Sequence, residues 1–242
     1  MAVKLGSARI DENGHAKGGK AGDQTGKEVS TQSWYKHSKG WRVFRAVSSE
    51  IANKIAWDMQ AACNNNNIGY DQSQRLTLYE AAKPYGFNCK DVTKKCETDC
   101  SALVRVCCAY AGVSLPNFRT TNEASVLLKS GKFVEMTGKK YTDSPDYLRR
   151  GDILVTKTQG HTVVVLSNGK YAEQTDDSYN AVLVTGKSVN IRNGSGISNT
   201  VIGIAHKGDI FDLCGVDGTW YRIPYKSGMG YISNKYSTLT TK

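Results

Sequence analysis

Apolar residues recur at helical spacing along the first half of the chain. In the segment 48–63, Ile51, Ile55 and Met59 fall on one face of a helix, and the asparagine run that follows favours its end. Similar patterns predict three more helices, over about residues 73–83, 99–110 and 122–130. The segment 11–28 is rich in glycine and polar residues and is predicted to be a loop.

The pattern changes to short β-prone runs after residue 150. Strands are predicted at residues 152–156, 161–166 and 171–174, and helices followed by strands favour an α+β domain. Beyond residue 178, glycines separate five further short strands, predicted at residues 188–192, 200–204, 209–213, 219–224 and 230–233. The last 59 residues are enough for a small all-β barrel. We therefore predict two domains, over residues 1–183 and 184–242.

The composition is that of a folded protein with an excess of positive charge. Of the 242 residues, 39% are hydrophobic and 22% are charged, and the net charge is +10. The excess is spread over both predicted domains and favours a polyanionic partner, whether nucleic acid, anionic lipid or a teichoic-acid-bearing cell wall. No segment reaches the roughly twenty apolar residues of a membrane span. The first residues lack the apolar core of a secretory signal, so we expect synthesis in the cytoplasm.

Seven cysteines in a chain of this length favour free thiols over a disulfide framework. The spacing of Cys89, Cys96 and Cys100 suggests a metal site, but no second ligand cluster follows it, so we predict neither metal nor cofactor. Two patterns in the glycine-rich loop fail as well. The P-loop pattern has Ala21 where Ser or Thr should hold magnesium, and the calcium-loop pattern at residues 11–14 lacks its later ligands.

Cys100 and His161 form a candidate pair of nucleophile and base. Asp99 is a capping residue in front of the cysteine, and a helix N-terminus favours the thiolate anion and lowers the pKa of the thiol. His161 stands 61 residues later, between Gly160 and a β-prone run, where a solvated histidine is unexpected. A nucleophilic cysteine needs such a base to take up its proton.

The base in turn needs a polar group that fixes its orientation. Glu173 follows His161 by twelve residues across a predicted turn at 167–170. Antiparallel pairing of the two strands would place both side chains on one face of the sheet. The neighbouring Gln174 would point to the other face and is the weaker candidate, but the sequence leaves this choice open.

Together these motifs resemble those of the NlpC/P60 cysteine peptidases. The resemblance covers about residues 85–178 and rests on the runs that begin at Asp99, Leu148 and Gly160 and on the step to Glu173. It implies a papain-like fold, a Cys–His–polar triad, and the peptide stem of bacterial peptidoglycan as the substrate. A glutamate as the third residue is the choice of the related CHAP amidases, so the identity of the cleaved bond stays open.

The resemblance also implies a substrate-binding surface beside the nucleophile. Asp99, Ser101 and Gly160 would contact the substrate there. Outside the core of the predicted catalytic domain, which spans about residues 40–178, Trp34 and Tyr35 are expected to line a substrate groove together with the N-terminal loop.

The C-terminal strands resemble bacterial SH3 domains. The resemblance rests on the runs Val189–Arg192, Val201–Gly203, Trp220–Ile223 and Gly228–Ile232. It implies a module that binds the cell wall. Three aromatic residues are candidates for its binding groove, or for its core: Trp220, Tyr221 and Tyr231.

The two resemblances combine into an interpretation of the chain as similar to phage endolysins. They imply a peptidoglycan hydrolase that cleaves an amide bond of the stem peptide by acyl transfer through Cys100, His161 and Glu173. We expect a monomer that binds peptidoglycan and anionic wall polymers, binds no nucleic acid and does not insert into membranes. It would be made in the cytoplasm of a bacterial host and act on the wall after release. The alternatives are a CHAP-type N-acetylmuramoyl-L-alanine amidase and a wall-binding protein without catalytic activity.

Overall fold

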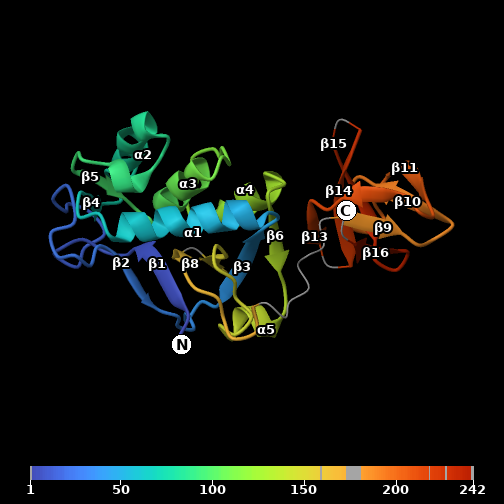
Figure 1. Cartoon of the computed structure of the whole chain (residues 1–242), viewed down its shortest axis with the longest axis horizontal. Coiled ribbons are helices and arrows are strands. Elements are labelled where there is room, and N and C mark those ends of the chain that lie inside the picture. The colour runs from blue at the N-terminus through green and yellow to red at the C-terminus, as the bar shows by residue number, and fades with distance from the viewer. Residues whose placement is uncertain (1, 159, 173–180, 218, 227, 241–242) are drawn as a thin grey trace.

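The chain folds into two lobes that follow one another in sequence (Figure 1). A computed structural model describes residues 2–158, 160–172, 181–217, 219–226 and 228–240. The larger N-terminal lobe combines helices with a sheet, and the smaller C-terminal lobe is built of strands.

A six-stranded antiparallel sheet forms the centre of the N-terminal lobe. Its strands are β1 (Lys4–Ala8), β2 (Val29–Ser33), β3 (Trp41–Ala46), β6 (Phe133–Met136), β7 (Ile153–Thr156) and β8 (Thr162–Val165). They lie in the order β2-β1-β8-β7-β3-β6. β8 therefore has β1 on one side, with Leu5 opposite Val165, and β7 on the other, with Leu154 opposite Val163.

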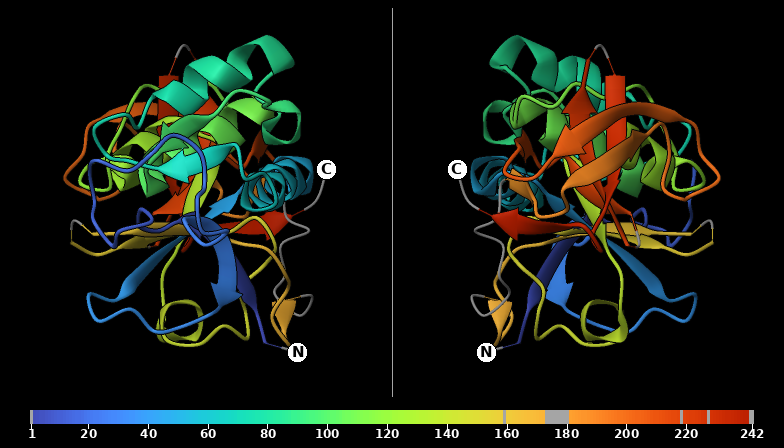
Figure 2. Two further views of the ribbon diagram at one scale, coloured as in Figure 1. Left: turned by 90° about the vertical axis from the view of Figure 1, so that its left-hand side faces the viewer. Right: turned by 90° about the vertical axis from the view of Figure 1, so that its right-hand side faces the viewer.

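Most helices lie on one side of this sheet. The helices are α1 (Ser49–Cys63), α2 (Thr77–Ala82), α3 (Cys100–Tyr110), α4 (Glu123–Lys129) and α5 (Lys139–Thr142), with 3₁₀ turns at Lys83–Tyr85 and Cys89–Asp91. α1 to α4 lie on one side, whereas α5 lies on the other (Figures 1 and 2). A separate parallel pair is formed by β4 (Ile68–Tyr70) and β5 (Cys96–Thr98).

The sheet is buried on both faces because alternate residues of its strands point in opposite directions. In β8, Val164 joins the main core under α1 and α3. Val163 and Val165 instead join a smaller core with Tyr141 of α5. Strands buried on both faces consist of consecutive apolar residues, so β7 and β8 could be predicted from the sequence.

The mixture of helices and sheet agrees with the predicted fold class, but the order of the elements differs. β1, β2 and β3 precede the first helix, whereas the sequence predicted helices first. The expected pairing of 171–174 with 161–166 is also wrong. Tyr171 and Ala172 lie in a turn in which the Ala172 N–H donates to the Gly169 carbonyl at 3.2 Å, and β1 takes the place beside β8.

The C-terminal lobe consists of two small sheets around an apolar core. Its strands are β9 (Ala181–Val184), β10 (Ser188–Arg192), β11 (Val201–His206), β12 (Ile210–Asp212), β13 (Gly215–Asp217), β14 (Trp220–Tyr225), β15 (Gly228–Ser233) and β16 (Ser237–Thr240). Their orders are β11-β10-β15-β14-β13 and β12-β9-β16. Val182, Ile191 and Ile223 are fully buried between them. The barrel includes all of β9, so the predicted domain start at residue 184 cuts through a strand.

One arginine of the barrel reaches into the N-terminal lobe. Nη1 of Arg222 donates to the carbonyl of Leu128 at 2.7 Å, and Nη2 donates to that of Phe133 at 3.2 Å. Nη2 also bonds the Cys214 carbonyl at 3.0 Å within the barrel. The barrel therefore packs against the end of α4 and the start of β6.

Candidate active site

Cys100 is the first residue of α3, where a buried carboxylate caps the helix. The Asp99 side chain accepts the backbone N–H of Ala102 at 2.7 Å, as the sequence predicted for an N-cap. Cys100 is 8% exposed. Its sulfur faces the backbone N–H of Thr162, the first residue of β8, and that of Ser101. The helix and the strand thus meet at the thiol.

His161 immediately precedes β8 and is therefore next in sequence to the residue that faces the thiol. Its N–H donates to Oγ1 of Thr156 at 3.0 Å, and its carbonyl accepts the N–H of Thr156 at 3.0 Å. These bonds fix the backbone at the turn between β7 and β8. The fold thus brings the Cys100 thiol to the start of β8, which His161 immediately precedes in the sequence.

Burial keeps the Cys100 thiol protonated. It raises the pKa of the thiol to about 12, and negative charge on Asp99 and Glu123 acts in the same direction. The N–H groups of Thr162 and Ser101 favour the thiolate but do not compensate. The expected lowering of the thiol pKa at the helix start is therefore wrong for the free protein, because desolvation outweighs the favourable position.

Burial also keeps His161 neutral. It lowers the pKa of the imidazole to about 4, and the positive charges of His37 and Arg9 contribute to this lowering. A neutral imidazole can accept a proton at pH 7. Among the described residues, no side chain hydrogen-bonds to the His161 ring.

Two hollows open beside this pair. The thiol hollow has a volume of about 370 Å³, and its lining includes Gln72, Asp99, Cys100, Ser101, Arg119 and Gly160. The histidine hollow has a volume of about 450 Å³ and is lined by Arg9, Ile10, Gln32, Tyr35 and His161. The structure thus places all three residues predicted to flank the nucleophile at the thiol hollow, and Tyr35 at the histidine hollow.

A buried arginine that the sequence analysis missed organises the wall of the thiol hollow. Arg75 forms an ion pair with Asp99 through its Nε and donates from Nη2 to Ser101 Oγ at 3.0 Å. Ser101 Oγ donates in turn to Asp99 Oδ1 at 2.9 Å. Nη1 of Arg75 bonds Asn117 Oδ1 at 2.7 Å. Arg75 lies in the polar first turn of the helix predicted over residues 73–83, so nothing in the sequence distinguished it from a surface residue.

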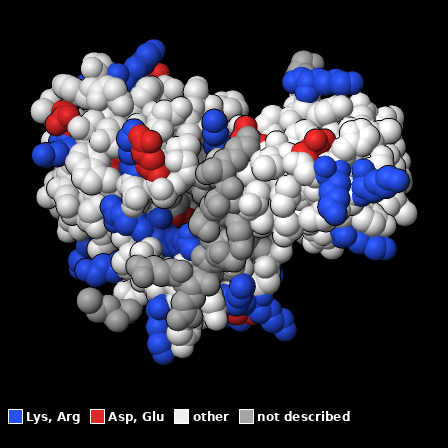
Figure 3. All heavy atoms as spheres, turned by 45° about the vertical axis from the view of Figure 1, so that its right-hand side comes forward, with Lys and Arg blue, Asp and Glu red and all other residues white. Residues whose placement is uncertain are grey.

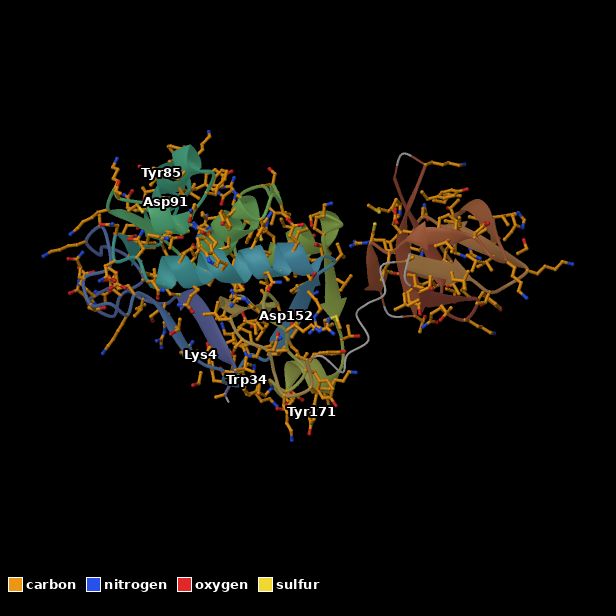
Figure 4. The ribbon with its side chains drawn as sticks, in the orientation of Figure 1. Lys4, Trp34, Tyr85, Asp91, Asp152 and Tyr171 are labelled. Atoms are coloured by element: carbon orange, nitrogen blue, oxygen red, sulfur yellow. The ribbon has the colours of Figure 1, made fainter. Side chains whose placement is uncertain are left out.

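The two aromatic residues predicted to line a groove are placed differently. The Tyr35 ring lies 6.0 Å from that of His37 and 5.6 Å from that of Trp41, beside the histidine hollow. Trp34 packs against the smaller core on the α5 side of the sheet. In Figure 4 it lies near Tyr171, far from Tyr85 at the α2 end of the lobe. Tyr35 packs against the same core but also lines the histidine hollow, so of the two it is the one placed to contact a ligand there.

Glu173 and Gln174, the predicted orienting residues, lie outside the described residues. Glu173 was predicted to share a face of the sheet with His161, which requires its strand to pair with β8. Because β1 and β7 occupy both edges of β8, this argument no longer supports the choice.

The three aromatic residues of the barrel do not share one face. Tyr221 packs against the barrel core, which Ile223 also fills. Trp220 and Arg222 alternate with them and so point outward, and Tyr231 lies opposite Arg222 in the next strand. The outward face that carries Trp220 and Tyr231 is thus the one through which Arg222 contacts the N-terminal lobe. Of the two alternatives for these residues, Tyr221 belongs to the core, and Trp220 and Tyr231 lie on the outward face.

Comparison with protein families assigns both lobes. The model of the endolysin-like domain matches residues 5–172, and that of the bacterial SH3 domain matches residues 187–238. The chain belongs to the endolysin-like domain family. The matched endolysin-like domain begins within β1 and includes Cys100 and His161, whereas it ends one residue before Glu173. A comparison with curated proteins finds no match to the chain.

Neither a metal cluster nor a membrane-spanning helix is found in the described part of this endolysin-like chain. There, no three His, Cys, Asp or Glu side chains are grouped to hold a metal ion. No described helix has the length and apolar character needed to cross a bilayer. Cys89 is one of the three cysteines whose spacing suggested a metal site. It is fully buried, and its N–H donates to Asp58 Oδ1 at 2.8 Å.

Proposed function

We propose that the chain is a peptidoglycan hydrolase that cleaves an amide bond of the stem peptide, with Cys100 as nucleophile and His161 as base. The observation that carries this proposal is the position of the Cys100 sulfur. It faces the N–H of Thr162, next to His161, at the start of a helix and at the edge of a hollow. Membership of the endolysin-like family and the SH3 domain support the cell wall as the place of action.

In the proposed reaction, neutral His161 takes the thiol proton as the Cys100 sulfur attacks the carbonyl carbon. Burial raises the pKa of the thiol and lowers that of the imidazole, so both groups are neutral in the free protein, and bound substrate must bring the two pKa values closer before the proton moves. The Cys100 N–H at the helix start can hold the oxyanion. The imidazolium then protonates the leaving amine, and water hydrolyses the thioester to release the acid and restore the thiol.

The residue that orients His161 has candidates in two segments of the chain. Glu173 is the candidate from the sequence. Tyr35 and His37 are the alternatives from the N-terminal segment, since both lie near the pair. Wall clearing by Glu173→Gln and by His37→Gln distinguishes between the two segments, because the variant with the larger loss of kcat lacks the orienting group.

The C-terminal barrel is proposed to hold the enzyme on the wall. Its strand arrangement and its family match support this role. The net charge of +10 would add attraction to anionic wall polymers. Lys and Arg side chains are spread over both lobes rather than gathered in one place (Figure 3). Tethering to the wall would raise the local concentration of scissile bonds.

The first test measures clearing of purified cell walls by single variants. Cys100→Ala and His161→Ala should each lower the rate by about 10³-fold or more, because each removes a partner of the same proton transfer. Cys214→Ala is the control, since Cys214 is a half-buried thiol of the barrel. Circular dichroism should show an unchanged fold for all three.

Mass spectrometry of the released fragments then identifies the bond. New amino termini within the stem peptide support an endopeptidase, whereas stems freed at the sugar lactyl group support the amidase alternative. Clearing by Cys100→Ala at the wild-type rate would contradict the nucleophile assignment. Wall binding without any released fragment would favour the non-catalytic alternative.

A further inference from the structure

A large hollow lies next to the thiol hollow and takes no part in the mechanism above. Its volume is about 900 Å³, and it extends along α2 and the segment that leads into β5. Gln72 and Arg119 line both hollows, so the two are neighbours across these side chains. A ligand seated at the thiol could therefore continue into the larger space.

The rim of this larger hollow is basic. Lys94, Lys95 and Arg119 line it, and the Arg119 side chain is 58% exposed. Within the described part of the chain, neither lysine has an ion-pair partner. Two carboxyl groups also line the hollow, Glu80 and Glu97. Burial raises the pKa of Glu97 to about 8, so at neutral pH it adds little negative charge.

The floor of the hollow offers apolar surface. Leu76 and Tyr85 line it and are 39% and 46% exposed. Ala81 and Pro84 line the same space. A cationic rim above an apolar floor fits a short peptide that carries a carboxylate, because the chain can pack on the floor while its charge meets the lysines.

We propose that this basic hollow, defined by Lys94, Lys95 and Arg119, binds a carboxylate-bearing part of the stem peptide beside the scissile bond. The inference rests on the proposed function, which places the stem peptide at Cys100. An extended peptide of four residues spans at most about 14 Å. Gln72 and Arg119 line both hollows, so such a peptide bound at the thiol would pass these side chains to enter the larger hollow. The enzyme would thus prefer stems with free carboxylates over amidated stems.

The test compares two synthetic stem peptides that differ only in amidation of the side-chain carboxylates. For Lys94→Gln/Lys95→Gln, we expect KM for the free acid to rise about tenfold, with kcat and the kinetics on the amidated peptide unchanged. Lys83→Gln/Lys90→Gln is the matched control. It removes the same charge from two exposed lysines that do not line the hollow.

Three outcomes would overturn the proposal. The first is an equal rise of KM on both peptides, and the second is a rise of KM no larger than that of the control pair. The third is a loss of activity on cell walls that disappears when teichoic acid is removed from the walls. The last would assign the lysines to a phosphate polymer. Titration of the peptides into Cys100→Ala keeps the test separate from the proposed chemistry. If Cys100→Ala bound the free acid selectively but the wild type did not cleave it, the proposed hydrolase function would be contradicted, whereas the proposed binding site in the hollow would stand.

Discussion

Glu123 is the buried neighbour of Cys100 that the sequence gave no reason to select. It lies in the first turn of a predicted helix, where acidic residues are common on surfaces. In the structure it is completely buried, and Oε1 accepts the Thr162 hydroxyl at 2.8 Å. The same Thr162 presents its N–H to the Cys100 sulfur. Glu123 therefore holds the strand end against the thiol.

The charge of Glu123 should set the alkaline limit of activity. Burial raises its pKa to about 8, with Asp99 adding to the shift and Arg75 and the Thr162 hydroxyl opposing it. Above that pH, Glu123 becomes negative and disfavours the Cys100 thiolate. We expect kcat/KM of the wild type to fall above pH 8, and Glu123→Gln to lack this fall.

Stability supplies a second measurement on the same variant. A group whose pKa is raised by folding stabilises the protein fully below its unfolded pKa and loses this contribution as pH rises through the folded pKa. For Glu123 the window runs from 4.5 to about 8. Urea unfolding at pH 5 and pH 8 should therefore differ less for Glu123→Gln than for the wild type. Glu50→Gln, on the exposed surface, should behave as the wild type; identical curves for all three would refute the role.

At the scale of elements, the sequence predicts the parts with a strong local pattern. α1 and α3 carry an apolar stripe and a capping side chain, so both are predicted within one residue. The strands β10 and β14 are predicted because each is a short β-prone run and glycines separate these runs. β2, with the sequence Val-Ser-Thr-Gln-Ser, has a single apolar residue, and β1 contains a glycine. These strands are stabilised by partners that no local pattern reveals.

The wrong neighbour for β8 follows from this omission. The sequence showed a strand, a turn and a further short run, which favours a hairpin. The place beside β8 belongs instead to β1, which is more than 150 residues away along the chain. The positions of Cys100 and His161 were predictable because each depends on its own element. The orienting group was not predictable, because it depends on which strands are neighbours.

β1 should therefore matter for both stability and activity. Leu5 is fully buried and lies opposite Val165 of β8. Leu5→Ala should lower the free energy of unfolding by about 2–5 kcal/mol, as expected for a leucine removed from a packed core. Wall clearing should also decrease at temperatures where the lobe is still folded, since β1 leads directly to Arg9 in the histidine hollow.

The measurement for this prediction is chemical denaturation followed by a clearing assay at low temperature. Ile197→Ala is the control, because Ile197 is 83% exposed and should change stability by less than about 0.5 kcal/mol. If Leu5→Ala resembled this control, β1 would not be an integral part of the sheet.

At the scale of the whole molecule, the two lobes are joined by more than a covalent connection. Arg222 hydrogen-bonds to carbonyls at the end of α4 and the start of β6. The side chain of Met229 also lies against Gly131 of the N-terminal lobe. The barrel therefore holds a defined position relative to the active site, which limits the wall geometries that both lobes can contact together.

Removal of Arg222 should free the barrel. Arg222→Ala loses the two bonds between the lobes, so we expect a larger radius of gyration in small-angle X-ray scattering and faster proteolysis between residues 172 and 181. Lys226→Ala is the matched control, because Lys226 bonds Ile202 within the barrel. Scattering curves that are identical for the two variants would show that Arg222 does not fix the lobes.

The position of β1 also determines when the enzyme can first exist during its synthesis. The ribosome makes β1 before the other strands of the sheet, but β1 completes its hydrogen bonds only after residues 164 and 165 have been added. Contacts between such distant segments form late and slow the folding of a domain. Until then the nascent chain has the cysteine helix but no strand to carry the histidine. The candidate active site can therefore form only after most of the N-terminal lobe has been synthesised.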